Sequence, residues 1–384
     1  MKIIKTSALL VAILAGITIQ GCSMTSNTSP STTGNAVTPI SNPLTLEQIY
    51  KDKYFKAQRS TYFKWLDDGT GYTVLEQREA DKKVGVKADD EKEHGVKGND
   101  IVFYNADGTG RKVLVAFEKL LPEGADEAFA IESYQFSKDG QWLMVFTNSE
   151  QVWRSRSRGD FWLLNLNTNK LSQLGGENPE PKKLMFAKFS PDSSKVAYVR
   201  DNNIYMQAVG SNTVSALTTD GSATTVNGNF DWVYEEEFSI RDGFSWSPDN
   251  KSIAYWQLDT SGVKYFTMIN NTKALYPSLT EFPYPKAGET NSAVRVGVVS
   301  LSDKQTRWAK LEGDNRDRYI PRISWAGDGE SLLIQDLNRP QNHNNLWLFN
   351  WQKQQLTKIL AEKDDAFIEW FYSANWSKSG EFFI

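Results

Sequence analysis

From residue 63 onward, apolar and polar positions alternate in short runs, and an aromatic residue followed by a turn precedes each run. Alternation with a period of two predicts β-strands, because successive side chains of a strand point to opposite faces. At 244–257, "FSWSPDNKSIAYWQ" places Ser-Pro-Asp-Asn between two such runs. Proline at the second position of a β-turn has the φ that the turn requires. The unit is therefore predicted to be a β-hairpin.

This unit recurs along the chain, with one aromatic residue before each turn. The copies carry Trp65, Phe136, Phe189, Trp246, Trp325 and Trp376. Their spacing corresponds to about one four-stranded sheet plus insertions, which predicts an all-β fold, the β-propeller, whose sheets follow one another as blades. A two-sheet sandwich is the alternative, but it gives no reason for a recurring turn motif.

Two segments depart from the repeat. Residues 80–99 are highly charged and contain glycine, which predicts a solvated loop within the first blade. Residues 260–295 are rich in aromatic side chains, namely Tyr265, Phe266, Tyr276, Phe282 and Tyr284. An exposed excursion of this kind indicates an interface, and the alternative is a long loop packed on its own propeller.

The N-terminal segment predicts export. Two lysines, an apolar run and Gly21-Cys22 form a signal peptide over 1–21 that is too short for a comfortable membrane span. Its end resembles the bacterial lipobox, which implies lipidation of Cys22 and an anchored protein in the periplasm or at the outer membrane. An ordinary secretory signal with a coincidental cysteine is the alternative. Residues 22–43 are then a lipidated cysteine and a flexible tether, and 44–384 are the propeller domain.

A short helix is expected just after the tether, because Thr45 and Gln48 have the spacing of a capping box.

Composition excludes several function classes. The formal charge of −4 and the lack of a basic stripe argue against a nucleic-acid partner. The single cysteine excludes a disulfide within the chain. His94 and His343 lie far apart without ligand spacing and are expected to be surface residues, so no metal site and no cofactor are predicted.

The stretch "DWVYEEEF" at 231–238 places Glu235, Glu236 and Glu237 side by side. In a strand these side chains would point to alternate faces, so they approach one ligand only where the backbone turns, as in a helical turn or bulge. A cation is the natural reason to hold them together: a metal, a Lys or Arg of the chain, or a ligand ammonium. The spacing is not that of a calcium loop. A solvated acidic loop is the alternative, although Trp232 and Tyr234 favour a shaped pocket.

The same stretch resembles the signature of the dipeptidyl peptidase IV family of serine peptidases. Three further segments resemble family motifs and occur in the family's order. They are "WRSRSRGDFWLLNL" at 153–166, "YPSLTEFPYPKAGETNSAVRVGV" at 276–298 and "QDLNRPQNHNNLWL" at 335–348.

The resemblance implies an eight-bladed propeller that covers an α/β-hydrolase domain and an enzyme that removes dipeptides from free N-termini, preferring proline or alanine in second place. Glu236 and Glu237 would grip the substrate's α-ammonium, with Glu235 beside them as a further substrate-binding candidate. Arg154 would hold the substrate carbonyl and steady the glutamates. The aromatic insertion would match the family's propeller arm, which contributes to homodimerisation.

The chain departs from the family in one respect: the nucleophile elbow G-x-S-x-G occurs nowhere in its 384 residues. No catalytic residue is therefore assigned within it. We expect 44–384 to be an incomplete propeller without its hydrolase domain, inactive alone. The rival hypotheses are a prolyl tripeptidyl peptidase relative, a non-catalytic periplasmic propeller that binds proteins, and a structural surface lipoprotein.

Overall fold

The computed structural model describes residues 45–51, 63–80, 96–125, 128–371, 374–377 and 380–383. The chain divides into two units, Met1–Tyr62 and Phe63–Ile384, and each is described by itself. The predicted signal peptide 1–21, Cys22, the rest of the tether to residue 43, and His94 lie outside the described residues.

In the first unit, a short π-helix, η1, spans Glu47–Lys51. Thr45 N donates to Gln48 Oε1 at 3.1 Å, and Gln48 N donates to Thr45 Oγ1 at 3.2 Å. These two reciprocal bonds are the predicted capping box, and they satisfy backbone donors that a helix start leaves unpaired. None of the helices in the described ranges has the length and hydrophobicity needed to cross a membrane.

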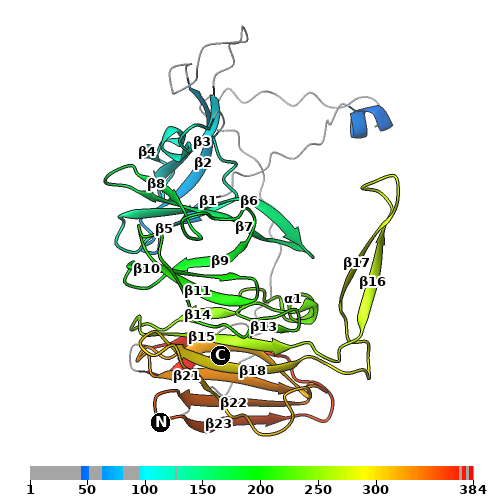
Figure 1. Ribbon diagram of the computed structural model, residues 1–384. Helices are drawn as coiled ribbons and strands as arrows, with labels where there is room; N and C mark the ends of the chain where they lie inside the picture. The colour runs from blue at the N-terminus through cyan, green and yellow to red at the C-terminus, as the bar shows by residue number, and fades with distance from the viewer. Residues whose placement is uncertain are drawn as a thin grey trace, which may run out of the picture. The chain divides into compact units, whose positions relative to one another are not determined.

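The described part of the second unit forms five successive four-stranded antiparallel blades, and a short hairpin follows them (Figure 1). The first blade holds β1 (Phe63–Trp65), β2 (Gly71–Ala80), β3 (Val96–Asn105) and β4 (Lys112–Val115), followed by the 3-10 helix η2 (Phe117–Leu120). The second holds β5 (Ser133–Phe136), β6 (Trp142–Val152), β7 (Ser155–Asn165) and β8 (Leu171–Gln173). The third holds β9 (Leu184–Phe189), β10 (Lys195–Arg200), β11 (Asn203–Ala208) and β12 (Val214–Ala216).

The fourth blade is built from β14 (Phe244–Trp246), β15 (Ser252–Asp259), β18 (Ala293–Ser300) and β19 (Thr306–Trp308), with β13 (Thr225–Asn227) also paired to β15. The fifth holds β20 (Arg318–Trp325), β21 (Ser331–Asn338), β22 (His343–Asn350) and β23 (Gln355–Lys363). The last hairpin pairs β24 (Asn375–Trp376) with β25 (Phe382–Phe383). His343 is exposed at the start of β22, as expected.

The loop predicted over 80–99 is shorter than its charge pattern suggested. β2 continues to Ala80 and β3 starts at Val96, because these two residues are partners in an antiparallel ladder. Charged side chains are tolerated in strands whose outer face meets solvent, so the charge run did not mark the ends of the loop. Residues 81–95 lie outside the described residues.

The predicted hairpin repeat is confirmed. Each repeat aromatic is the last residue of the first strand of its unit, and each of these strands pairs with the next one. In the Ser-Pro-Asp-Asn turn, Asn250 N donates to Ser247 O at 3.1 Å, which closes the β-turn.

Three of the four tryptophans of the repeat, Trp246, Trp325 and Trp376, also join neighbouring blades. Each of these three donates its indole N–H to the residue that stands just before the repeat aromatic of the preceding blade. The bonds are Trp246 to Lys188 O at 3.3 Å, Trp325 to Ser245 O at 3.3 Å, and Trp376 to Ser324 Oγ at 2.9 Å. The aromatic position of the repeat therefore lies at the boundary between sheets, where a buried indole finds a partner for its N–H group.

The hydrophobic core consists of clusters between consecutive blades. One cluster joins the first and second blades, another the second and third, another the third and fourth, and the largest the fourth and fifth. The second, third and fourth sheets therefore each bury both faces against their sequence neighbours. This is the packing of propeller blades and not that of a sandwich with one core between two sheets.

One feature of the sheets did not follow from the repeat. β7 pairs with both β8 and β9 through Arg158↔Met185 and Gly159↔Leu184. The second and third blades are thereby joined into a single eight-stranded sheet. The residues of β7 that pair with β9, Arg158 and Gly159, lie close to the turn at the end of the β6–β7 hairpin.

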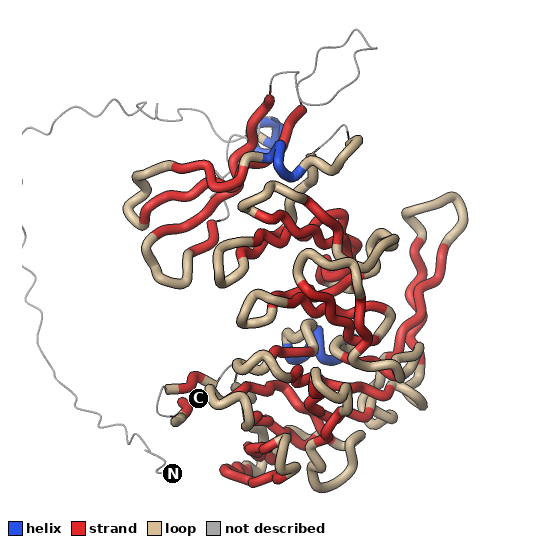
Figure 2. The backbone as a smooth tube through the Cα atoms, turned by 60° about the vertical axis from the view of Figure 1, so that its left-hand side comes forward, coloured by secondary structure: helices blue, strands red, loops and turns tan. Residues whose placement is uncertain are grey.

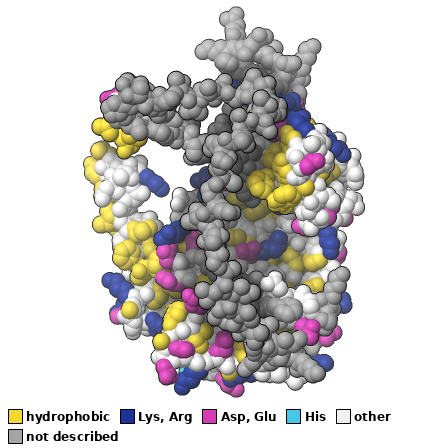
Figure 3. Space-filling model, turned by 180° about the vertical axis from the view of Figure 1, so that it is seen from behind, with side chains coloured by type: hydrophobic (Ala, Val, Ile, Leu, Met, Phe, Trp, Pro, Cys, Tyr) yellow, Lys and Arg dark blue, Asp and Glu magenta, His cyan; other side chains and the backbone are white. Residues whose placement is uncertain are grey.

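The aromatic insertion is a two-stranded hairpin, β16 (Tyr265–Asn270) paired with β17 (Ser278–Pro283). It stands away from the blades in both views of the backbone (Figures 1 and 2). Its apolar side chains are largely exposed, with Leu275 at 92% and Tyr276 at 80%. Seen from behind, hydrophobic side chains follow this edge of the molecule (Figure 3). The alternative of a loop packed on its own blades is therefore wrong for the outer part of the insertion.

Candidate functional site

The first strand of the fourth blade is interrupted, and the acidic motif lies in the interruption. β13 and β14 pair with the same edge of β15, through Asn227↔Gln257 and Phe244↔Tyr255. Between them, Trp256 alone bonds to the two ends of the excursion. Gly228 N donates to Trp256 O at 3.0 Å, and Trp256 N donates to Gly243 O at 3.1 Å. The segment 229–242 thus leaves the sheet and returns to the same place.

Two glycines make this return possible. Gly243 N donates to Gly228 O at 3.1 Å, and a Cβ atom on Gly243 would lie 2.5 Å from the carbonyl carbon of Gly228. Gly228 has a φ of +68°, the left-handed region that side chains with a Cβ disfavour. The backbone of the excursion can close only because both residues lack a side chain.

The excursion folds into one short helix, α1 (Trp232–Phe238). Asp231 is its N-cap: the carboxylate accepts from Tyr234 N at 3.2 Å and from Ser292 Oγ at 2.6 Å. Burial raises the pKa of Asp231, and these hydrogen bonds oppose the rise. Ser239 ends the helix in the left-handed conformation. The backbone therefore turns at the acidic motif, as its chemistry requires.

One face of α1 is packed into the core between the fourth and fifth blades. Tyr234 stacks on Phe230 with ring centroids 4.8 Å apart, and its hydroxyl accepts from Ile320 N at 3.0 Å. Phe238 is buried on the same side. Tyr234 is thus part of the core and not a pocket wall, whereas Trp232, the other aromatic residue considered from the sequence, lines a cavity.

The three glutamates occupy consecutive helical positions, so their side chains are about 100° apart around the helix axis. Glu235 is turned inward, where its side chain is 7% exposed and accepts from Ser155 Oγ at 2.5 Å. Its other oxygen lies 3.3 Å from Arg241 Nε. Glu236 faces the β6–β7 hairpin and Glu237 faces the cavity. Each carboxylate therefore has its own surroundings.

Arg154 reaches Glu236 from another blade. It lies in the two-residue turn between β6 and β7, where Val152 pairs with Ser155. Its Nη2 atom donates to Glu236 Oε1 at 2.5 Å, while the Arg154 side chain stays 74% exposed and that of Glu236 25%. Charge-assisted bonds of this type orient both groups. Within the described residues the remaining N–H groups of Arg154 have no partner, so they are available to a ligand.

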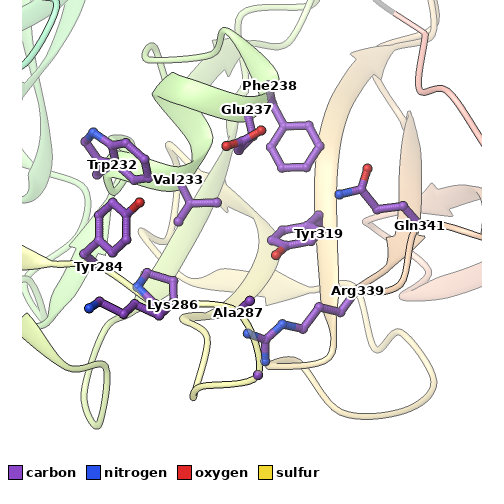
Figure 4. A pocket seen from close by; sticks show the side chains of 12 residues that line it. Trp232, Val233, Glu237, Phe238, Tyr284, Lys286, Ala287, Tyr319, Arg339 and Gln341 are labelled. Atoms are coloured by element: carbon purple, nitrogen blue, oxygen red, sulfur yellow. The ribbon is translucent and has the colours of Figure 1, made fainter.

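Beside α1 lies an open cavity of about 260 Å³. Its walls come from α1, from the segment after β17, and from the fifth blade. The lining residues are Trp232, Val233, Glu237, Phe238, Tyr284, Pro285, Lys286, Ala287, Gly288, Tyr319, Arg339 and Gln341. In Figure 4 the Glu237 carboxylate and the Arg339 guanidinium stand on opposite walls, with the Tyr319 hydroxyl between them. Burial raises the pKa of Tyr319, so this phenol is a neutral hydrogen-bonding group at physiological pH.

Glu237 has no hydrogen-bond or ion-pair partner among the described residues, although Arg339 shares its cavity. Arg339 Nη2 instead donates to Glu289 O at 2.6 Å. A carboxylate that faces an open cavity and has no cationic side chain as a partner among the described residues is available to a ligand with a positive charge. In the described ranges no three His, Cys, Asp or Glu side chains form a group that could hold a metal ion.

The structure brings together all four segments singled out in the sequence. The 153–166 segment supplies Arg154, the acidic motif supplies Glu236 and Glu237, and the 276–298 and 335–348 segments supply cavity walls. Glu235 is the one candidate residue that does not face the cavity or its rim, because its carboxylate is buried and contacts Ser155 and Arg241. Sequence reasoning missed Ser155, Arg241 and the paired glycines. The glycines flank the motif in "NGN" and "RDGF", which could have revealed them, but no pattern marks Arg241 as buried.

Comparison with known proteins bears on the family of the chain. Residues 137–384 match the family model described as the dipeptidyl peptidase IV (DPP IV) N-terminal region. The chain belongs to this family. Most of the chain thus corresponds to the dipeptidyl peptidase IV N-terminal region. The prediction of an all-β propeller is confirmed.

Individual relatives point the same way. The chain is 33% identical to dipeptidyl aminopeptidase B of Saccharomyces cerevisiae over 210 residues, which cover 53% of this chain and 25% of the yeast protein. It is 27% identical to dipeptidyl-aminopeptidase B of Aspergillus niger over 358 residues, which cover 87% of this chain and 38% of the fungal protein. The crystal structure of Porphyromonas gingivalis dipeptidyl peptidase 4 superposes with a TM-score of 0.74 at 30% identity, covering 89% of this chain and 45% of that one. The chain thus spans less than half the length of each of these relatives.

Proposed function

We propose that this dipeptidyl peptidase IV N-terminal region binds the free N-terminus of a peptide substrate, with Glu236 and Glu237 receiving the α-ammonium group. Arg154 is proposed to hold the first carbonyl of the substrate and to keep Glu236 in place. The observation that supports this is the contact of 2.5 Å between Arg154 and Glu236, next to a second carboxylate that faces a cavity without a partner among the described residues.

The chemistry suits a peptide ammonium. A peptide α-amino group has a pKa of about 7.7–8.0 and is largely cationic at neutral pH. Hydrogen bonds between charged groups contribute about 1.5–3 kcal/mol each, so two of them offset much of the cost of desolvating the ammonium. Such an anchor also fixes the distance from the N-terminus to the bond that is cut, so the product would have one fixed length. The family of the chain is the reason to propose dipeptides as that product, and the resemblance of its motifs is the reason to propose proline or alanine in second place.

For the whole protein we propose serine-type hydrolysis by a Ser-His-Asp triad. No nucleophile elbow occurs in the 384 residues, so the proposal assigns no catalytic residue within them. A prolyl tripeptidyl peptidase would share the acidic anchor. Product analysis on one peptide with a free N-terminus separates the two, because it releases either two or three residues.

The binding proposal is tested on the chain with the peptide Ala-Pro-Ala and its N-acetylated form, by calorimetry and by the change in tryptophan fluorescence, which should be lost in Trp232→Phe because Trp232 lies in the cavity wall. We expect the free peptide to bind and the acetylated one to bind at least tenfold more weakly, since acetylation removes the charge. Affinity should also fall above about pH 8, where the amine loses its proton.

The variants Glu236→Gln and Glu237→Gln should each reduce the affinity, and together they should abolish the preference for the free N-terminus. Glu330→Gln, at an exposed turn of the fifth blade, is the matched control. If the double variant bound the free peptide as tightly as the wild type, the anchor assignment would be wrong.

We further propose export with a lipid anchor on Cys22, and a homodimer formed through the exposed β16–β17 hairpin. The hairpin's apolar surface supports the second of these, because exposed patches of this kind mark association sites.

A further inference from the structure

The turn that carries Arg154 has a backbone conformation that its own residues do not favour. Trp153 has a φ of +52°, and the turn contains only Trp153 and Arg154 between paired strands. Positive φ at the first position of a two-residue hairpin turn favours Asn, Asp and Gly, and a bulky residue there is strained. Such a conformation persists only where the surroundings impose it. The direction of Arg154 therefore depends on contacts outside the turn.

Contacts on both sides of Arg154 supply this restraint. The guanidinium carbon of Arg241 lies 4.3 Å from the centre of the Trp153 ring, a cation–π contact. On the other side, Ser155 Oγ donates to Glu235 Oε1. The residues before and after Arg154 are thus both held by side chains of the excursion that carries Glu236.

Glu235 and Arg241 are joined to each other away from solvent. Their side chains are 7% and 10% exposed, and Glu235 Oε2 lies 3.3 Å from Arg241 Nε without hydrogen-bond alignment. Arg241 Nη1 donates to Asn229 Oδ1 at 3.1 Å and to Phe230 O at 2.9 Å. Arg241 therefore ties the end of the excursion to its beginning. Burial lowers the pKa of Arg241 to about 10, and Glu235 opposes this decrease, so the guanidinium stays charged at neutral pH.

We propose that Glu235 and Arg241 are positioning residues that hold the Trp153–Arg154 turn against α1, so that Arg154 meets Glu236, and that neither contacts the peptide. This inference rests on the proposed function, in which Arg154 and Glu236 bind the peptide N-terminus. It assigns Glu235 a role different from that of its neighbours in the acidic motif: Glu236 and Glu237 face the ligand, and Glu235 holds the arginine that assists them.

A double-mutant cycle for peptide binding separates positioning from direct contact. Glu235→Gln keeps the size of the side chain and removes its charge. We expect it to weaken binding of Ala-Pro-Ala by about tenfold in the wild-type background, because Arg154 is no longer held. In an Arg154→Ala background the same change should alter the affinity by less than about twofold. A tenfold loss in both backgrounds would mean that Glu235 touches the ligand, and no loss in either would mean that it has no role; both results overturn the inference.

A second measurement does not depend on peptide binding. Amide hydrogen exchange over residues 151–156 should become faster in Glu235→Gln, while exchange in the fifth blade and the urea midpoint stay close to wild type. Ser155→Ala, which removes only one of the two restraints, should give a smaller increase, and Glu330→Gln should give none. Unchanged exchange over 151–156 in Glu235→Gln would refute the positioning role. Failure of the wild type to bind any peptide would instead refute the proposed function and leave this exchange result to decide the inference.

Discussion

The closure of the excursion at Gly228 gives a prediction whose size follows from the structure. Replacing Gly228 by alanine has two costs. The backbone at φ +68° disfavours a Cβ by about 1–2 kcal/mol. The added Cβ would also stand 2.9 Å from Ile204 Cγ1 and from Val199 Cγ2, in the core between the third and fourth blades. Overpacking of a well-packed core costs about 1–3 kcal/mol.

We therefore expect Gly228→Ala to lower the free energy of unfolding by about 2–5 kcal/mol. The chain provides a matched control in Gly140, which has a φ of +69° but no atom within 4 Å of an added Cβ. Gly140→Ala should therefore show the backbone cost alone, about 1–2 kcal/mol. The difference between the two variants isolates the steric cost of the Ile204 and Val199 contacts.

The assay is urea unfolding of the whole chain, followed by tryptophan fluorescence, with the midpoints compared at unchanged slope. Peptide affinity should fall in Gly228→Ala, because the base of the excursion must shift, and should be retained in Gly140→Ala, whose turn is remote from α1 in the sequence. Equal destabilisation by the two substitutions would refute the reasoning, since it would mean that the core accommodates the methyl group without cost.

Three further predictions concern the helix and the hairpin. Burial raises the pKa of Asp231 above 3.8, so between the unfolded and the folded pKa the folded chain keeps a proton that the unfolded chain has lost. The free energy of unfolding of the wild type should therefore fall as pH rises from about 4 through the folded pKa. Asp231→Asn lacks this titration, so its free energy of unfolding relative to the wild type should rise over the same range, which urea unfolding at several pH values measures. Tyr234→Phe leaves Ile320 N–H buried without its acceptor and should cost about 1–3 kcal/mol, whereas Tyr265→Phe on the exposed hairpin should cost less than about 0.5 kcal/mol. The triple variant Leu275→Ser, Tyr276→Ser, Leu279→Ser should keep the urea midpoint of the wild type, because all three side chains are exposed, and should be monomeric in sedimentation velocity. A dimer that persists in this variant would exclude the hairpin as its interface.

Much of the fold could be predicted from the sequence because the signal is local. The alternation of apolar and polar positions and the turn residues act within one hairpin, so Trp246 and its Ser-Pro-Asp-Asn turn were sufficient to predict the strands on either side. The pairing of β7 with β9 was not predictable in this way. It depends on two segments, near Arg158 and Met185, whose sequences contain no mark of each other.

The candidate site shows the same division. The need for a turn at the acidic motif followed from the alternation of side chains in strands, and the helix meets that need. In the sequence, Trp232 and Tyr234 looked equivalent as neighbours of the glutamates. In the structure Trp232 lines the cavity and Tyr234 is buried in the core, and this difference depends on the rotation of α1 against the core. Arg241 was invisible because arginine is usually exposed, and only the tertiary structure places it beneath Trp153.

The pairing of β7 with β9 bears on how the site would respond to motion. The second and third blades share a backbone ladder of two residue pairs, whereas the third and fourth blades meet mainly through side chains. Arg154 belongs to the second blade and Glu236 to the excursion of the fourth blade. We therefore expect a relative tilt of blades to occur more readily between the third and the fourth, and such a tilt would change the distance between the Arg154 guanidinium and the Glu236 carboxylate.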